Sequence, residues 1–214
     1  MAKKKQTIAD KIFEEYERIK FELGHVPSRM DLFNNMDADI YLLCMKNSKF
    51  NPFRQYLDYR HKRQDLPEGG EYLYHSLARD FLHELETTAM TKVYKMPILY
   101  AFYNHGAIRK EITKEQALTE WKNFFQRNKN WRDLKHAITY EKYLAISEQE
   151  HIRHIQSMPV KHLQGGFFYV KPGTLLALQP EIVPFLNNQF LQNEMHDILA
   201  YRTADYYFRR YHSH

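Results

Sequence analysis

Glycine, proline and cysteine are all scarce in this 214-residue chain. It has 7 glycines and 8 prolines, which disfavours a fold built from many short strands and tight turns. Its single cysteine, Cys44, rules out a disulfide within the chain and favours a reducing compartment. No stretch approaches the roughly 18 consecutive apolar residues that a membrane span requires. We therefore expect a cytoplasmic protein that does not enter the membrane.

Phosphate-binding and targeting signals are also missing. A phosphate-binding loop needs glycines followed by a lysine and a hydroxyl-bearing residue. Gly69-Gly70 and Gly165-Gly166 are followed instead by Glu-Tyr and Phe-Phe. The first twenty residues begin basic and turn acidic, without the apolar core of a secretion signal. We expect this chain alone to be no ATPase and to carry no cofactor.

Aromatic residues are abundant, with 16 tyrosines and 14 phenylalanines. Such a composition suits either a large core or a surface made for stacking and for contact with cations. Hydrophobic residues make up 43% of the chain, which is typical of a globular protein. The net charge of +5 is compatible with a nucleic-acid partner and does not by itself argue for one.

The first two predicted helices meet at a short corner. Apolar residues recur every three or four positions from Thr7 to Leu23, as in an amphipathic helix. Gly24 supplies the left-handed conformation that ends it, and Ser28 with Asp31 has the pattern of a cap for the next helix. Short corners of this kind are common structural joints, and they also form the turn of helix-turn-helix DNA-binding modules.

Most of the remaining chain also has helical periodicity. The pattern breaks at Asn51-Pro52 and most clearly at "LPEGGEYL", where we place a domain boundary. Beyond it, Thr113 is a predicted N-cap and Gly106 a predicted helix end. The predicted helices after the boundary are 71–88, 96–105, 114–127, 139–155 and 187–211.

Only "GGFFYVKPGTLLAL" is typical of strands. Two short apolar runs flank Lys171-Pro172-Gly173, which places proline and glycine where a type II turn needs them. We expect a β-hairpin near residues 167–178. The predicted fold is mainly α and multi-helical, with a helix-turn-helix-like basic subdomain over 1–66 and a helical domain with the hairpin over 71–214.

The strongest functional signal is a basic, aromatic stretch over residues 46–63. It contains six lysines and arginines against one acid, Asp58, interleaved with Phe and Tyr. Such a stretch beside a helix-turn-helix corner is suited to contacting phosphates. Because aromatic residues recur at every third position, a core role for them stays open. The candidate nucleic-acid-binding residues are Arg29, Lys46, Lys49, Arg54, Arg60, Lys62, Arg63 and, at the hairpin tip, Lys171.

Twelve histidines raise the question of a metal site. His151 and His154 lie three residues apart on a predicted helix, so that one face could present two ligands. The trio Asp80, His83 and Glu84 has a similar arrangement. A solvated helix face is the simpler explanation of both patterns, and we assign no metal ligand from them.

Two other patterns suggest catalysis without supporting it. Asp133-Leu134-Lys135 has the residue types of a metal-dependent nuclease element, but in a helical or loop context rather than on a strand. Cys44 lies within the apolar stretch "IYLLCM" and has no neighbouring base to activate its thiol. We therefore assign no catalytic residue.

Two segments resemble a known family. "LGHVPSRMDLF" and above all "LETTAMTKVYKMPILYAFYNHGAI", residues 85 to 108, are similar to the region beyond the motor in bacterial superfamily 2 helicases of the DEAD/DEAH, restriction type. A later "FFY" hairpin and an ending like "YRTADYYFRRY" follow in the same order. The resemblance implies an accessory region whose ATP-binding motifs would lie upstream, and it carries over no catalytic residue.

Together these observations predict a nucleic-acid-binding accessory module of a helicase-like DNA-processing protein. Its expected partners are DNA, duplex or single-stranded, and a helicase motor in cis or in trans. The alternative is a protein–protein adaptor that docks on a helicase or on a defence-system partner.

Overall fold

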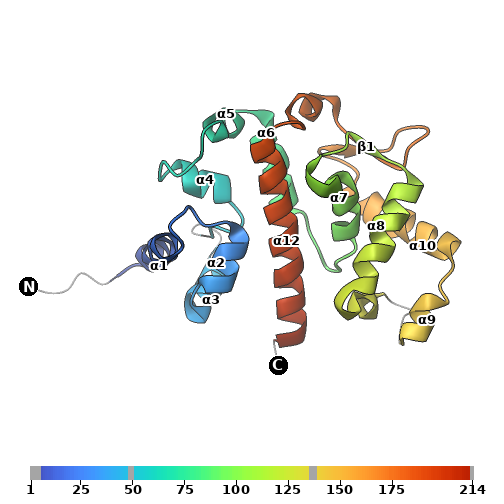
Figure 1. The fold of residues 1–214 in the computed structure, drawn as a ribbon, viewed down its shortest axis with the longest axis horizontal. Helices are drawn as coiled ribbons and strands as arrows, with labels where there is room; N and C mark the ends of the chain where they lie inside the picture. Colours follow the sequence, from blue (N-terminus) through green and yellow to red (C-terminus); the bar gives the residue numbers. More distant parts are fainter. Residues whose placement is uncertain (1–5, 48–50, 135–138, 213–214) are drawn as a thin grey trace, which may run out of the picture. The chain divides into compact units, whose positions relative to one another are not determined.

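A computed structural model describes residues 6–47, 51–134 and 139–212. The chain divides into two compact units. Unit 1 comprises Met1–Thr87 with Ala200–His214, and unit 2 comprises Thr88–Leu199. The boundary expected between residues 66 and 71 falls inside unit 1, because the helices on its two sides pack against each other. Both units are mainly helical, as the sequence predicts (Figure 1).

Unit 1 is built from short helices and the end of one long one. Among its described residues no helix is long and apolar enough to cross a membrane, and the same holds for the described part of unit 2. The helices are α1 (Ile8–Leu23), α2 (Arg29–Asn35), α3 (Ala38–Lys46), α4 (Tyr56–His61), α5 (Gly70–Tyr74), α6 (Leu77–Thr87) and the last part of α12 (Gln189–His212).

The corner between α1 and α2 forms as predicted. Gly24 adopts the left-handed conformation (φ 71°) and its amide donates to the Lys20 carbonyl. Ser28 caps α2, accepting from the Asp31 amide while the Asp31 side chain accepts from the Ser28 amide. These reciprocal bonds satisfy amides that a helix start otherwise leaves without partners.

The aromatic residues of the basic stretch belong to the core of unit 1. Phe53 and Tyr56 are fully buried, and Phe53 stacks on Tyr201 of α12 at 4.6 Å between ring centroids. Tyr59 packs edge-on against Tyr16 of α1. Fully burying a large apolar side chain stabilises a fold by about 1.5–3 kcal/mol. These rings therefore hold the helices together and are not available to stack on nucleic-acid bases. Phe50, the fourth aromatic residue of the stretch, lies outside the described residues.

Unit 2 combines helices with a small antiparallel sheet. Its helices are α7 (Lys95–Phe102), η2 (Asn104–Gly106), α8 (Lys114–Gln126), η3 (Arg127–Asp133), α9 (Tyr140–Leu144), α10 (Glu148–Ile155), η4 (Gln156–Val160), α11 (Lys161–Leu163), η5 (Pro180–Phe185) and the first part of α12. Its strands are β1 (Glu111–Ile112), β2 (Phe168–Tyr169) and β3 (Leu176–Leu178), in the order β1-β3-β2.

The predicted hairpin is confirmed. Strands β2 and β3 pair antiparallel, with Phe168 opposite Leu178. In the turn between them, the Thr174 amide donates to the Lys171 carbonyl at 3.1 Å, and Gly173 has a positive φ of 82°. Proline at the second and glycine at the third turn position are the residues that this geometry favours.

Two of the predicted helices are each divided in the structure. The segment 71–88 forms α5 and α6, because the Ser76 hydroxyl donates to the Leu73 carbonyl and accepts from the Ala78 amide, ending one helix and starting the next. The segment 139–155 forms α9 and α10, separated by a capping box of Ser147 and Glu150. Periodicity across one continuous apolar face conceals breaks of this kind, because both pieces face the same core.

Candidate nucleic-acid interface

Arg29, expected to face a phosphate, is instead a core residue of unit 1. Its side chain is fully buried and forms an ion pair with Glu86 of α6, in which Nε donates to Oε1 at 3.1 Å. The guanidinium also lies over the Tyr56 ring, 4.8 Å from its centroid. Arg29 is the one basic residue of α2. Helix α2 therefore presents no cation to a DNA groove, which corrects the predicted role of Arg29.

Arg60 and Arg63 are also engaged by the protein itself. Arg60 is buried, and its Nε donates to the Asp65 carbonyl at 3.4 Å. Arg63 is half-buried, with its guanidinium 3.4 Å from the centroid of the Tyr59 ring and Nη1 donating to the Tyr59 carbonyl at 3.0 Å. Both arginines act as internal supports for the α4–α5 connection, so their charges are only weakly available to a ligand.

Lys171 at the hairpin tip is half-buried and paired. Its Nζ lies 2.7 Å from the Glu111 carboxylate, which joins the turn to strand β1. The pair raises the pKa of Lys171 and lowers that of Glu111 through this hydrogen bond. A phosphate would have to compete with Glu111 for this lysine.

Three predicted residues remain as open cations. Lys46, at the end of α3, Arg54, just before α4, and Lys62, just after it, are exposed. Within the described part of the chain none of the three has an ion pair with a carboxylate. Lys49 lies outside the described residues. Among the described residues, the sequence-predicted cations that stay open are therefore Lys46, Arg54 and Lys62, all of unit 1.

A second group of cations, in unit 2, was not predicted. After α8 the chain turns through η3, where Arg127, Lys129 and Arg132 are exposed. We call these three residues the basic loop. No acidic residue lies between its first and last members, and no described carboxylate forms an ion pair with them. The segment "RNKNWR" was overlooked because its charge run is shorter than that of residues 46–63, although the alternation of bases with polar residues is visible there.

The basic loop is held in an unusual backbone conformation. Asn128 (φ 48°) and Lys129 (φ 65°) are both left-handed. This conformation costs a residue such as lysine roughly 1–2 kcal/mol, whereas asparagine adopts it more readily. The next residue anchors the loop, because the Asn130 side-chain amide donates to the Phe124 carbonyl at 3.0 Å. Non-glycine residues cluster in this region of backbone space at functional sites more often than elsewhere.

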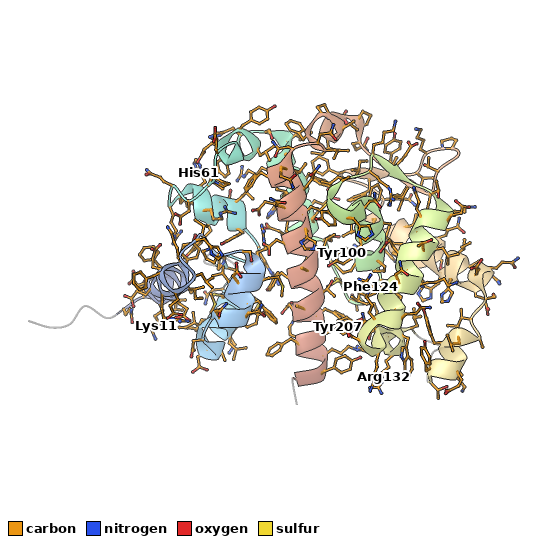
Figure 2. The ribbon with its side chains drawn as sticks, viewed as in Figure 1. Lys11, His61, Tyr100, Phe124, Arg132 and Tyr207 are labelled. Carbon is orange, nitrogen blue, oxygen red and sulfur yellow. The ribbon has the colours of Figure 1, made fainter. Side chains whose placement is uncertain are left out.

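Aromatic side chains lie next to the basic loop. The Arg132 guanidinium lies 5.5 Å from the centroid of the Trp131 ring, and Trp131 lies 5.9 Å from the Tyr140 ring at the start of α9. Tyr140 is 43% exposed and stacks on the buried Tyr143. Figure 2 labels Arg132, which belongs to η3 between α8 and α9. Arg132 and the exposed Tyr140 ring thus both contact Trp131, on the same part of unit 2.

The histidines considered as metal ligands in α10 have structural roles instead. His151 is buried, and its Nδ1 accepts a hydrogen bond from the Trp121 indole at 3.1 Å. Burial, with a smaller contribution from Lys122, lowers the pKa of His151, which keeps the imidazole neutral. His154 packs edge-on against Tyr94. Both rings line a pocket of about 580 Å³ in unit 2, with Lys92 and Arg153 on its lining.

Two further groups that the sequence analysis considered and did not assign, Asp133 and Cys44, are buried. Asp133 is buried at the end of η3, and Lys135 lies outside the described residues. Cys44 is buried on α3, and its burial raises the thiol pKa to about 12. A thiol of this kind is protonated and unreactive at neutral pH.

Comparison with known proteins adds no assignment. No family model matches the chain. No curated protein matches it, and no solved structure matches it.

Proposed function

We propose that this chain is a nucleic-acid-binding accessory module that holds single strands on the basic loop of unit 2. The observation that carries the proposal is the combination of Arg127, Lys129 and Arg132 with the exposed Tyr140 ring. Cations that follow the phosphate backbone beside an aromatic ring on which a base can stack are the usual means of binding single strands without sequence preference.

The open cations of unit 1 supply a second set of phosphate contacts in this proposal. Lys46, Arg54 and Lys62 are exposed on helices α3 and α4 or beside them. The likeness of the segment "MTKVYKMP" to helicase accessory regions is the reason for proposing a helicase-like motor as the partner that delivers the strand. In this proposal the chain holds the nucleic acid, and the motor moves along it by using ATP.

Fluorescence anisotropy with labelled single-stranded, forked and duplex DNA across a salt series tests the proposal. The chain should bind single strands with an affinity that falls steeply with salt. Changing Arg127, Lys129 and Arg132 together to glutamine should reduce the slope of log affinity against log salt by about 2, since each single-strand contact contributes roughly 0.7. Tyr140→Ala should weaken single-strand binding by about 1–3 kcal/mol and duplex binding much less.

A matched variant separates a binding site from general charge. Changing Lys110, Lys114 and Lys161 to glutamine removes the same charge from exposed positions of the same unit. This control should leave the salt slope unchanged. If both triple variants weaken binding equally, the basic loop is not a site. If the unaltered chain does not bind at low salt, the nucleic-acid proposal is wrong.

One observation favours the adaptor function as a second candidate. Phe21 on α1 is 87% exposed, and Phe13 on the same helix is 41% exposed. Amphipathic helices bind partner proteins by laying exposed apolar side chains into a hydrophobic groove. If the chain ignores DNA but co-purifies with a helicase motor, and Phe21→Ser abolishes that association, the adaptor function replaces the first proposal.

A further inference from the structure

His61, Glu71 and His75 form a cluster of potential metal ligands in unit 1. The Nδ1 atom of His61 lies 2.8 Å from Oε2 of Glu71, and Nε2 of His75 lies 3.8 Å from the same oxygen. One ligand atom from each residue lies within 4.8 Å of the other two. Two imidazoles and one carboxylate thus converge on one point, although His61 and Glu71 are ten positions apart in sequence.

Local structure brings the three side chains together. Glu71 lies in α5 and His75 follows it by four residues, so that their side chains project from the same face one helical turn apart. His61 is the last residue of α4. The α4–α5 connection is fixed to α1 because Asp65 accepts from the Tyr16 hydroxyl at 2.8 Å and pairs with Lys20 at 2.5 Å. The cluster therefore lies on anchored backbone.

Aromatic packing orients the His61 ring. It stacks on Tyr74 with the ring centroids 3.9 Å apart and the planes 14° from parallel. Tyr74 is in turn contacted by the Arg79 guanidinium, 4.8 Å from its centroid, and Arg79 pairs with Asp58 at 2.8 Å. Supporting contacts of this kind fix the orientation of a ligating histidine and contribute to metal affinity.

We propose that His61, Glu71 and His75 bind one zinc ion. Zinc takes imidazole nitrogen at about 2.0–2.1 Å and carboxylate oxygen at about 2.0–2.2 Å, which in tetrahedral geometry separates neighbouring ligand atoms by about 3.3 Å. The two separations from Glu71 Oε2, 2.8 and 3.8 Å, lie on either side of that value. The third separation, between the ligand nitrogens of His61 and His75, is at most 4.8 Å, so side-chain rotations that bring the two rings closer would form the site.

The donor set favours zinc over the common hard cations. Magnesium and calcium select oxygen ligands, whereas imidazole nitrogen suits zinc and its transition-metal neighbours. Three protein ligands leave one tetrahedral position for water. Because Glu71 and His75 are exposed, that position is open to solvent and to an incoming ligand. The site has the ligand number of a reactive zinc centre rather than that of a closed structural one.

Isothermal titration with Zn²⁺ tests the inference. The sequence ends in His212 and His214, which could bind zinc independently. The titration is therefore made with both of these residues replaced by alanine. This parent should bind one Zn²⁺ per chain. Titrations with Mg²⁺ and Ca²⁺ should show no binding at the same concentrations.

Variants of the ligands then locate the ion. His61→Ala and His75→Ala should each lower zinc affinity at least tenfold, because even supporting residues around a metal contribute about 10–100-fold. His25→Ala is the matched control, since His25 also faces a carboxylate in unit 1, Asp31 at 3.5 Å, and should not change the affinity. Glu71→Gln preserves shape and should also weaken binding.

Co²⁺ provides a measurement that depends on geometry. Its visible absorption reports tetrahedral coordination and should appear in the parent and disappear in His61→Ala. Far-UV circular dichroism identifies any variant that fails to fold, and Glu71→Gln remains informative in that case. Absence of zinc binding by the parent, or equal binding by the His61→Ala, His75→Ala and His25→Ala variants, would overturn the proposal.

Discussion

Replacing Arg29 by methionine tests whether this residue supports the core or contacts a ligand. The exposed fractions of the Arg29 and Glu86 side chains are 0% and 4%. Removing one member of such a buried pair leaves the other charge uncompensated, at a cost of about 3–5 kcal/mol. Glu86 keeps two weaker partners, the Tyr56 amide at 3.4 Å and His83 at 3.7 Å. We therefore expect a loss near the lower limit, about 3 kcal/mol.

His83 makes the loss of stability in Arg29→Met depend on pH. The hydrogen bond with Glu86 raises the pKa of His83 above its ordinary value. Below the raised pKa the imidazolium compensates part of the Glu86 charge, and this contribution is lost as the pH rises through it. Arg29→Met should thus be more damaging at pH 8 than at pH 6.

Thermal unfolding followed by far-UV circular dichroism measures the effect. For a unit of about one hundred residues, a loss of about 3 kcal/mol lowers Tm by roughly 12–24 °C. The double variant Arg29→Met/Glu86→Leu should recover most of the stability, because replacing both charges by apolar side chains is often neutral or favourable. Single-strand affinity measured on folded protein should not change. A loss below about 1 kcal/mol, or a double variant no more stable than the single one, would refute the reasoning.

Two further predictions concern buried titratable groups. Burial lowers the pKa of His151. Below a pH of about 6.5 the unfolded chain therefore binds a proton at this residue that the folded chain does not bind, and the free energy of unfolding falls as the pH falls. His151→Gln, which can still accept from Trp121, should flatten this dependence between pH 6.5 and 5 in urea titrations; identical slopes would contradict it. Burial raises the pKa of Cys44 to about 12. A disulfide reagent at pH 8 should therefore label Cys44 at least about a hundredfold more slowly in native than in denatured protein. Comparable labelling rates would exclude a buried thiol.

The helical fold and several of its boundaries could be predicted from the sequence because they depend on neighbouring residues. Ser28 and Asp31 are three positions apart, and the hairpin turn uses consecutive residues, Lys171 to Thr174. Each forms its own hydrogen bonds whatever the remaining chain does. The breaks at Ser76 and Ser147 are also local, but continuous apolar periodicity concealed them.

The candidate sites were predicted less well, because a charge run does not show which side chains reach the surface. In residues 46–63 the same pattern contains exposed Lys62, half-buried Arg63 and buried Arg60. Arginine has an apolar stem and a planar head that pack on aromatic rings, so a basic residue among tyrosines can be part of the core. The basic loop was not predicted, because three cations form too short a charge run to stand out in the sequence. In the structure all three are exposed.

The sequence by itself determined the mainly helical class, the α1–α2 corner and the β2–β3 hairpin, because capping and turn formation are short-range interactions between adjacent residues. Only the tertiary structure decided that Arg29 meets Glu86, 57 positions away, and that His61, Glu71 and His75 converge. It also decided which cations stay in water. Such pairings follow from how whole helices pack, and the free energy that selects one packing is distributed over the entire core.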